Sequence, residues 1–130
     1  MKISGYSGKP IWQKLGIQAE TRVYLVEAPA DYQEMIGWTE KLTITKTRAD
    51  LIHCFVTSKA SLEVLFPGLI EKVAEGGCIW ISWYKKSAGI KTDITEDIIR
   101  EIVLPTGWVD VKVCAVSEQW SGLKIMRRKK

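Results

Sequence analysis

Polar and aromatic residues gather near the ends of three apolar runs of the sequence, at residues 22–26, 51–56 and 78–83. Ammonium groups pair with phosphate or carboxylate, and aromatic faces stack on planar groups. These segments therefore predict a site for an anionic small molecule with a planar part. The alternative is a set of solvated loops held by two anchoring aromatic side chains. The candidate ligand-binding residues are Glu27, Asp31, Ser58, Lys59, Ser82, Trp83, Tyr84, Lys85 and Lys86.

A second candidate lies at the start of the chain, where residues 5–10 form a glycine-rich turn before a short helix. Backbone N–H groups at such a turn can bind an anion, although the spacing is not that of a P-loop. We favour the alternative of an N-terminal clasp that Tyr6 and Trp12 pack onto the sheet. The candidate anion-binding residues are Gly5, Tyr6, Ser7, Gly8 and Lys9.

The remaining reactive side chains give little support for catalysis. His53 is the only histidine and has no serine or carboxylate near it in sequence, so we expect a core histidine rather than a general base. The three cysteines, Cys54, Cys78 and Cys114, lie in apolar runs without a CxxC pair. We therefore expect reduced, buried thiols in a cytoplasmic protein, and no metal site.

Composition predicts one globular domain over residues 1–130, with an N-terminal turn and short helix at 1–20. The net charge of +4 comes from 19 basic and 15 acidic residues, and the basic tail 127–130 supplies four of the basic groups. The body of the chain is then neutral, which disfavours a nucleic-acid partner. No run approaches the roughly 18 apolar residues of a membrane span, and we expect no membrane association. The sequence is compatible with a homo-oligomer.

The apolar periodicity predicts strands that alternate with helices. We expect strands at 22–26, 42–45, 51–56, 78–83, 109–116 and 122–126, and helices at 10–15, 32–36, 61–75 and after Asp93 or Thr95. This order predicts a three-layer α/β fold, a mostly parallel sheet that ends in an antiparallel hairpin. Pro67 should kink or split its helix, which Gly76-Gly77 should end. Only about five residues follow strand 42–45, so that strand should be antiparallel or barely formed. Asp93, Glu96 and Asp97 should complement a helix dipole.

Residues 69–81, a helix followed by Gly-Gly and a buried strand, resemble the matching segment of class I methyltransferases, and the likeness extends over about residues 21–128. The chain is more closely similar to an uncharacterised bacterial family, domain of unknown function 3052. Four blocks carry that resemblance, at residues 5–10, 82–86, 92–97 and 112–123. It implies a truncated Rossmann-like methyltransferase scaffold and no particular activity.

The loop after the first strand departs from the methyltransferase pattern. Those enzymes hold S-adenosylmethionine in a glycine-rich loop, whereas residues 26–31 contain Pro29 and no glycine. We therefore expect a non-catalytic or small-ligand-binding domain without a cofactor. One alternative is an S-adenosylmethionine-dependent methyltransferase with a degenerate site, in which Glu27 or Asp31 reaches the ribose. Another is a protein- or nucleic-acid-interaction module that uses the tail and surface tryptophans such as Trp108 and Trp120.

Overall fold

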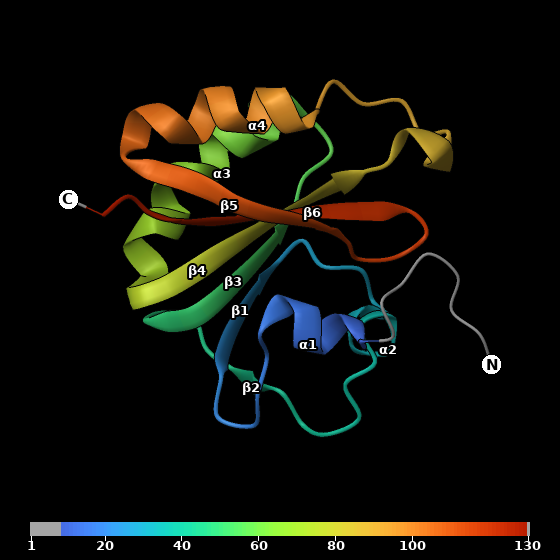
Figure 1. The fold of residues 1–130 in the computed structure, drawn as a ribbon, viewed down its shortest axis with the longest axis vertical. Helices are drawn as coiled ribbons and strands as arrows, with labels where there is room; N and C mark the ends of the chain where they lie inside the picture. The colour runs from blue at the N-terminus through green and yellow to red at the C-terminus, as the bar shows by residue number, and fades with distance from the viewer. Residues whose placement is uncertain (1–8, 130) are drawn as a thin grey trace.

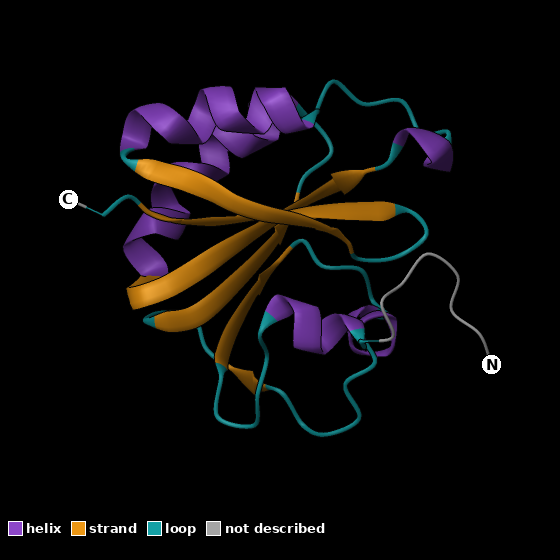
Figure 2. Ribbon diagram, in the orientation of Figure 1, coloured by secondary structure: helices purple, strands orange, loops and turns teal. Residues whose placement is uncertain are grey.

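A computed structural model of the chain describes residues 9–129. Its six strands form one sheet in the order β2-β1-β3-β4-β6-β5, with helices on both faces (Figures 1 and 2). Strands β2, β1, β3 and β4 are parallel to one another, and β6 is antiparallel to both β4 and β5. The expected Rossmann-like sheet with a C-terminal hairpin is therefore confirmed. The strands are β1 (Arg22–Val26), β2 (Thr43–Ile44), β3 (Ala49–Phe55), β4 (Val73–Tyr84), β5 (Trp108–Ala115) and β6 (Trp120–Arg127).

Each face of the sheet has its own helices and its own core. On β3, Ile52 and Cys54 join the core under α3 and α4, whereas Leu51 and Phe55 join the core under α1 and α2. Successive side chains of a strand point to opposite faces, which explains why residues 51–56 are almost continuously apolar. The helices are α1 (Ile11–Leu15), α2 (Tyr32–Ile36), α3 (Lys59–Lys72) and α4 (Glu96–Val103).

Helix α3 differs from its prediction in two ways. Pro67 lies inside an unbroken helix, so it does not split α3. The carbonyl that loses its partner belongs to Glu63, and both residues are exposed, so water can replace the missing N–H. The helix also ends at Lys72 rather than at Gly76-Gly77, because the chain already pairs with β3 from Val73 onward. Within residues 9–129, no helix is long and apolar enough to cross a bilayer.

Strand β2 is as short as predicted, but its direction was predicted wrongly. It pairs with β1 in parallel, through Arg22–Thr43 and Val23–Ile44. The prediction assumed that β2 would lie beside β3, whereas β1 separates the two strands. Residues 27–42, including α2, make the long crossover that a parallel pair needs. The short link 45–48 suffices because β2 reaches only the first two residues of β1.

Candidate ligand-binding site

A cavity of about 760 Å³ lies at the edge of the sheet where β1, β3 and β4 end. The carboxyl ends of parallel strands meet at this edge, and open α/β sheets bind their ligands there. The first turns of α3 and the turn before β6 complete its walls. The lining residues are Glu27, Pro29, Phe55, Val56, Thr57, Ala60, Ser61, Val64, Leu65, Tyr84, Gln119 and Trp120.

Three aromatic side chains make one wall of the cavity and support one another. Tyr84 stacks on Trp120 with ring centroids 4.1 Å apart, and Phe55 meets Trp120 edge-on at 4.9 Å. Phe55 and Trp120 are buried, and Tyr84 is half-buried. Such contacts hold the rings in place, so the wall is a preformed surface for a flat group.

Among residues 9–129, Glu27 is the only charged residue of the lining. It is exposed and directly follows β1, and its φ of 57° lies in the left-handed region. A residue with a Cβ seldom adopts this conformation, which costs roughly 1–2 kcal/mol relative to glycine. The loop therefore makes the bend that glycine would favour and at the same time brings a carboxylate to the cavity.

A buried hydrogen-bonded chain lies beneath the aromatic wall. The hydroxyl of Tyr32 is 2.8 Å from His53 Nδ1, and Nε2 of the same ring is 2.7 Å from Ser82 Oγ. His53 also stacks on Phe55, with ring centroids 4.4 Å apart. The expected core histidine is confirmed, and it is fully buried. The sequence did not reveal Ser82 as a partner of His53, because the two residues are far apart in sequence and only the pairing of β3 with β4 brings them together.

Burial sets the protonation states of these hydrogen-bonded side chains. Desolvation lowers the pKa of His53 to about 3 and raises the pKa of Tyr32 well above its ordinary value. His53 is therefore neutral at physiological pH. Because its ring has no exposed surface, it is not a general base for a ligand in the cavity.

The structure brings only two of the predicted ligand-binding residues, Glu27 and Tyr84, to the cavity lining. Ser82 is buried against His53, and Trp83 belongs to the core under α3 and α4. Ser58 caps α3, where its side chain accepts a hydrogen bond from the Ser61 N–H at 3.1 Å. These side chains are occupied by the scaffold and do not line the cavity.

The predicted lysines and Asp31 also lie outside the lining. Lys59 lies in a groove between α3 and α4, and its backbone N–H donates to Asp93 at 2.8 Å. Lys85 donates its backbone N–H to the Gln119 carbonyl, and Lys86 is exposed in the turn that follows. Asp31 precedes α2 without a side-chain capping bond. The anionic ligand predicted from these lysines therefore has no support at this cavity.

The N-terminal candidate cannot be placed, because Gly5, Tyr6, Ser7 and Gly8 lie outside the described residues. Lys9 is described and exposed. Sequence reasoning missed Phe55, Val64 and Gln119 as lining residues. Most tryptophans were expected in the core, and Trp108 and Trp120, which the interaction-module alternative would need at the surface, are both buried. One signal in the sequence was available: Val64 is apolar but lies off the apolar stripe of its helix, so it is exposed, and exposed apolar side chains can mark a binding site.

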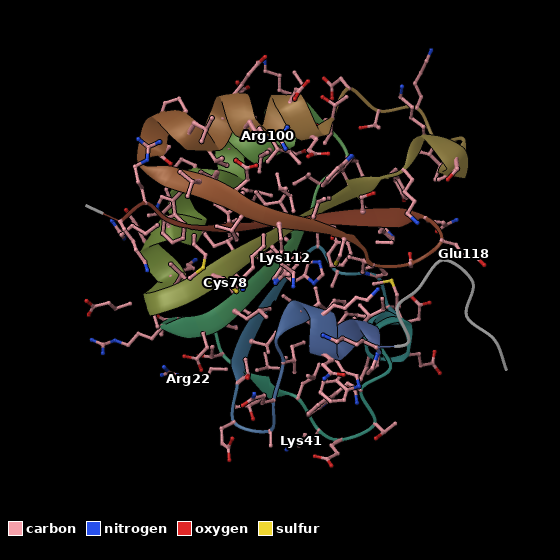
Figure 3. The ribbon with its side chains drawn as sticks, viewed as in Figure 1. Arg22, Lys41, Cys78, Arg100, Lys112 and Glu118 are labelled. Carbon is pink, nitrogen blue, oxygen red and sulfur yellow. The ribbon has the colours of Figure 1, made fainter. Side chains whose placement is uncertain are left out.

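Other polar clusters are structural. Arg100 on α4 pairs with Asp97 and Asp110, at 3.0 and 2.9 Å, and with Glu96 (Figure 3). The guanidinium lowers the pKa of Asp110. Asp97 and Glu96 lie in the first turn of α4 as predicted, whereas Asp93 instead accepts from the start of α3. Among residues 9–129, no group of three or more potential ligands could hold a metal ion.

The cysteines are free thiols within the described residues. Cys54 and Cys78 are buried, as predicted, and Cys114 is half-buried. Desolvation raises the pKa of Cys54 to about 12 and that of Cys78 to about 11. Such thiols stay protonated and are poor nucleophiles.

Solved structures with the same fold are methyltransferases or Rossmann-type proteins. A ribosomal protein L11 methylase from Lactobacillus delbrueckii subsp. bulgaricus superposes with a TM-score of 0.55 and 14% identity, over 90% of this chain and 74% of that chain. A type 11 methyltransferase from Sulfolobus solfataricus gives 0.53 and 13%, over 85% and 73%. A protein of the NADB-Rossmann superfamily from Streptococcus agalactiae gives 0.56 and 12%, over 100% and 71%.

The chain therefore has a Rossmann-like, methyltransferase-type scaffold. No family model and no curated protein matches its sequence. The resemblance to domain of unknown function 3052 thus stays a prediction, and at these identities the structural likeness establishes the fold alone.

Proposed function

We propose that this chain is a small-molecule-binding domain on a methyltransferase scaffold, and that its ligand occupies the cavity between β1, β3 and α3. The cavity carries this proposal, since a preformed, mainly apolar hollow at the ligand-binding edge of the sheet is the usual form of such a site.

The lining suggests the chemistry of the ligand. Three aromatic residues with Val64 and Leu65 favour a flat apolar group, and Glu27 is the single charge. A carboxylate attracts an ammonium group or accepts from hydroxyl groups. The best-suited ligand is therefore a planar molecule with a cationic or hydroxyl-bearing arm.

The same lining supports a binding role without catalysis. Among the described residues, the lining holds one carboxylate and no histidine, cysteine or lysine, so it offers few groups for proton transfer. The loop after β1 also lacks the glycines that allow a backbone to approach an adenosyl cofactor. We therefore expect binding without a chemical step.

Titration calorimetry with tryptamine and with its neutral analogue tryptophol tests the proposal. We expect saturable binding of both, and two- to fivefold weaker binding of tryptamine to Glu27→Gln, the range for an exposed ion pair. Val64→Arg should abolish binding, because Val64 lines the cavity and arginine puts a larger, charged side chain there. The fold should be kept, because Val64 is 78% exposed and does not belong to the core.

The matched control is Val113→Arg, which places the same substitution at an exposed position of β5 away from the cavity. Its affinity should equal that of the unmodified protein. Equal loss in Val64→Arg and Val113→Arg, or no binding of either compound, would contradict the assignment of the cavity.

A second candidate is an S-adenosylmethionine-dependent methyltransferase, favoured by the scaffold shared with solved methyltransferases and by Glu27 at the end of β1. In this case Glu27 would accept hydrogen bonds from the ribose hydroxyls. Calorimetry with S-adenosylmethionine and S-adenosylhomocysteine separates the two candidates. Micromolar binding that Val64→Arg or Glu27→Gln weakens would favour the methyltransferase, and no saturable heat would favour the binding domain.

A further inference from the structure

A second cavity, of about 600 Å³, lies at the opposite edge of the sheet. The start of β4, the start of β5 and the end of β6 meet there, whereas the first cavity lies where β4 ends and β6 begins. Figure 1 shows the C-terminal segment beside the start of β4. The two cavities are therefore separate sites.

Positive charge gathers at this second cavity. Arg127, Arg128 and Lys129 all line it, and of the described residues in the lining Glu75 alone is acidic. None of the three basic side chains makes an ion pair with another residue of the 9–129 range. Their charges are therefore not neutralised by the part of the chain that the structure describes.

The basic segment is held against the fold. The backbone N–H of Arg128 donates to the Gly107 carbonyl at 2.8 Å. The guanidinium of Arg127 lies over the ring of Trp108, 5.3 Å from its centroid. A cation held in this way loses less conformational freedom when it meets a ligand.

Trp108, a residue of the same cavity lining, has a buried donor without a partner in the described part of the chain. Trp108 is 2% exposed, and its indole N–H has no acceptor among residues 9–129. The indole N–H of Trp80, which is also fully buried, donates to the Leu15 carbonyl at 3.1 Å. Native structures seldom leave a buried donor unpaired, so this N–H marks Trp108 as a residue whose surroundings need an explanation.

We propose that this cavity binds a small phosphate-bearing molecule. Guanidinium groups recognise phosphate through paired N–H donors, and a phosphate has enough acceptor oxygens to serve two arginines together. The phosphate can belong to free inorganic phosphate or to a nucleotide. This inference does not depend on the function proposed for the first cavity.

Nuclear magnetic resonance of the ¹⁵N-labelled full chain tests the site through the indole N–H of Trp108, identified as the resonance missing from Trp108→Phe. Inorganic phosphate and adenosine monophosphate are titrated separately at constant ionic strength. We expect a saturable shift of this resonance with at least one of them. Arg127→Gln/Arg128→Gln should weaken the binding at least tenfold.

The matched control is Lys41→Gln/Lys46→Gln, which removes the same charge from exposed positions around β2. Figure 3 places Lys41 well away from the C-terminal segment. This control should keep full affinity. Saturation by phosphate alone identifies the free ion as sufficient, and saturation by the nucleotide alone identifies a nucleotide ligand. No saturable shift with either, or an equal loss in the control, overturns the proposal.

Discussion

Mild acid should destabilise this protein through one residue, His53. It is the only histidine of the chain, and it is fully buried with Tyr32 at Nδ1 and Ser82 at Nε2. Desolvation lowers its pKa from 6.5 to about 3 in the folded protein. A protonated imidazole would place a charge in the core, and no carboxylate hydrogen-bonds to it there.

The sign and size of the effect follow from proton linkage. Below pH 6.5 the unfolded chain binds a proton that the folded chain does not bind until the pH nears 3. The stabilisation is complete above pH 6.5, and it falls by about 1.4 kcal/mol for each pH unit below that. Between pH 6.5 and 4.5 the loss from His53 should therefore approach roughly 2.5 kcal/mol.

The two carboxylates whose pKa is lowered by an ion pair, Asp50 and Asp110, do not interfere in this range. Arg22 lowers the pKa of Asp50, and Arg100 lowers that of Asp110. Groups with a lowered folded pKa stabilise above their unfolded pKa, and this contribution is lost as the pH falls through the folded pKa. Since the ordinary value is 3.8, their loss belongs to pH values under about 4.

Urea unfolding followed by tryptophan fluorescence at pH 7, 6, 5 and 4.5 measures the effect. His53→Gln is the matched variant, because glutamine keeps polar atoms at the site but does not titrate. We expect its unfolding free energy to lack this slope, whatever its absolute stability. A ring-proton resonance of His53 that titrates with a midpoint above 5, or the same slope in both proteins, would refute the reasoning.

Three further substitutions test the scaffold by denaturant unfolding. Tyr32→Phe should cost about 1–3 kcal/mol, because it leaves a buried nitrogen of His53 without a partner; a cost under about 0.5 kcal/mol would contradict the buried chain. Gly122→Ala should cost roughly 1–3 kcal/mol, since an added Cβ would lie 2.9 Å from Val116 Cγ2, and unchanged stability would show that Val116 moves freely. Thr95→Ala should cost about 1 kcal/mol by removing the cap of α4, whereas alanine at the exposed Thr39, in the loop before β2, serves as the control.

Local patterns predicted most of the elements because their causes are local. The β-rich run 22–26 is β1 over the same residues, and Thr95 caps α4 through the Ile98 N–H. Alternation and helical spacing depend on neighbours a few residues apart, so one segment of sequence contains the whole signal. The errors concern Pro67 and the end of α3, where contacts with solvent and with β3 decide the outcome.

The site was less accessible to sequence reasoning. Glu27 and Tyr84 could be foreseen, because the end of a strand is a local feature and strand ends meet at one edge. The sequence could not show which of the lysines near the same strand ends face the cavity. A shift of one residue along a strand moves a side chain to the opposite face, from the cavity to solvent or core. Trp83 shows this, as it directly precedes Tyr84 but belongs to the core under α3 and α4.

By itself, the sequence determined the fold class, the buried central strands, the neutral core histidine and the glycine-free loop after β1. Only the tertiary structure decided that β2 runs parallel on the far side of β1, that Phe55 and Trp120 form a cavity wall, and that Trp108 meets the basic C-terminal segment. The physical reason is the range of the interactions. Backbone conformation and burial are encoded in nearby residues, whereas a binding site is made by side chains that only strand order and register bring together.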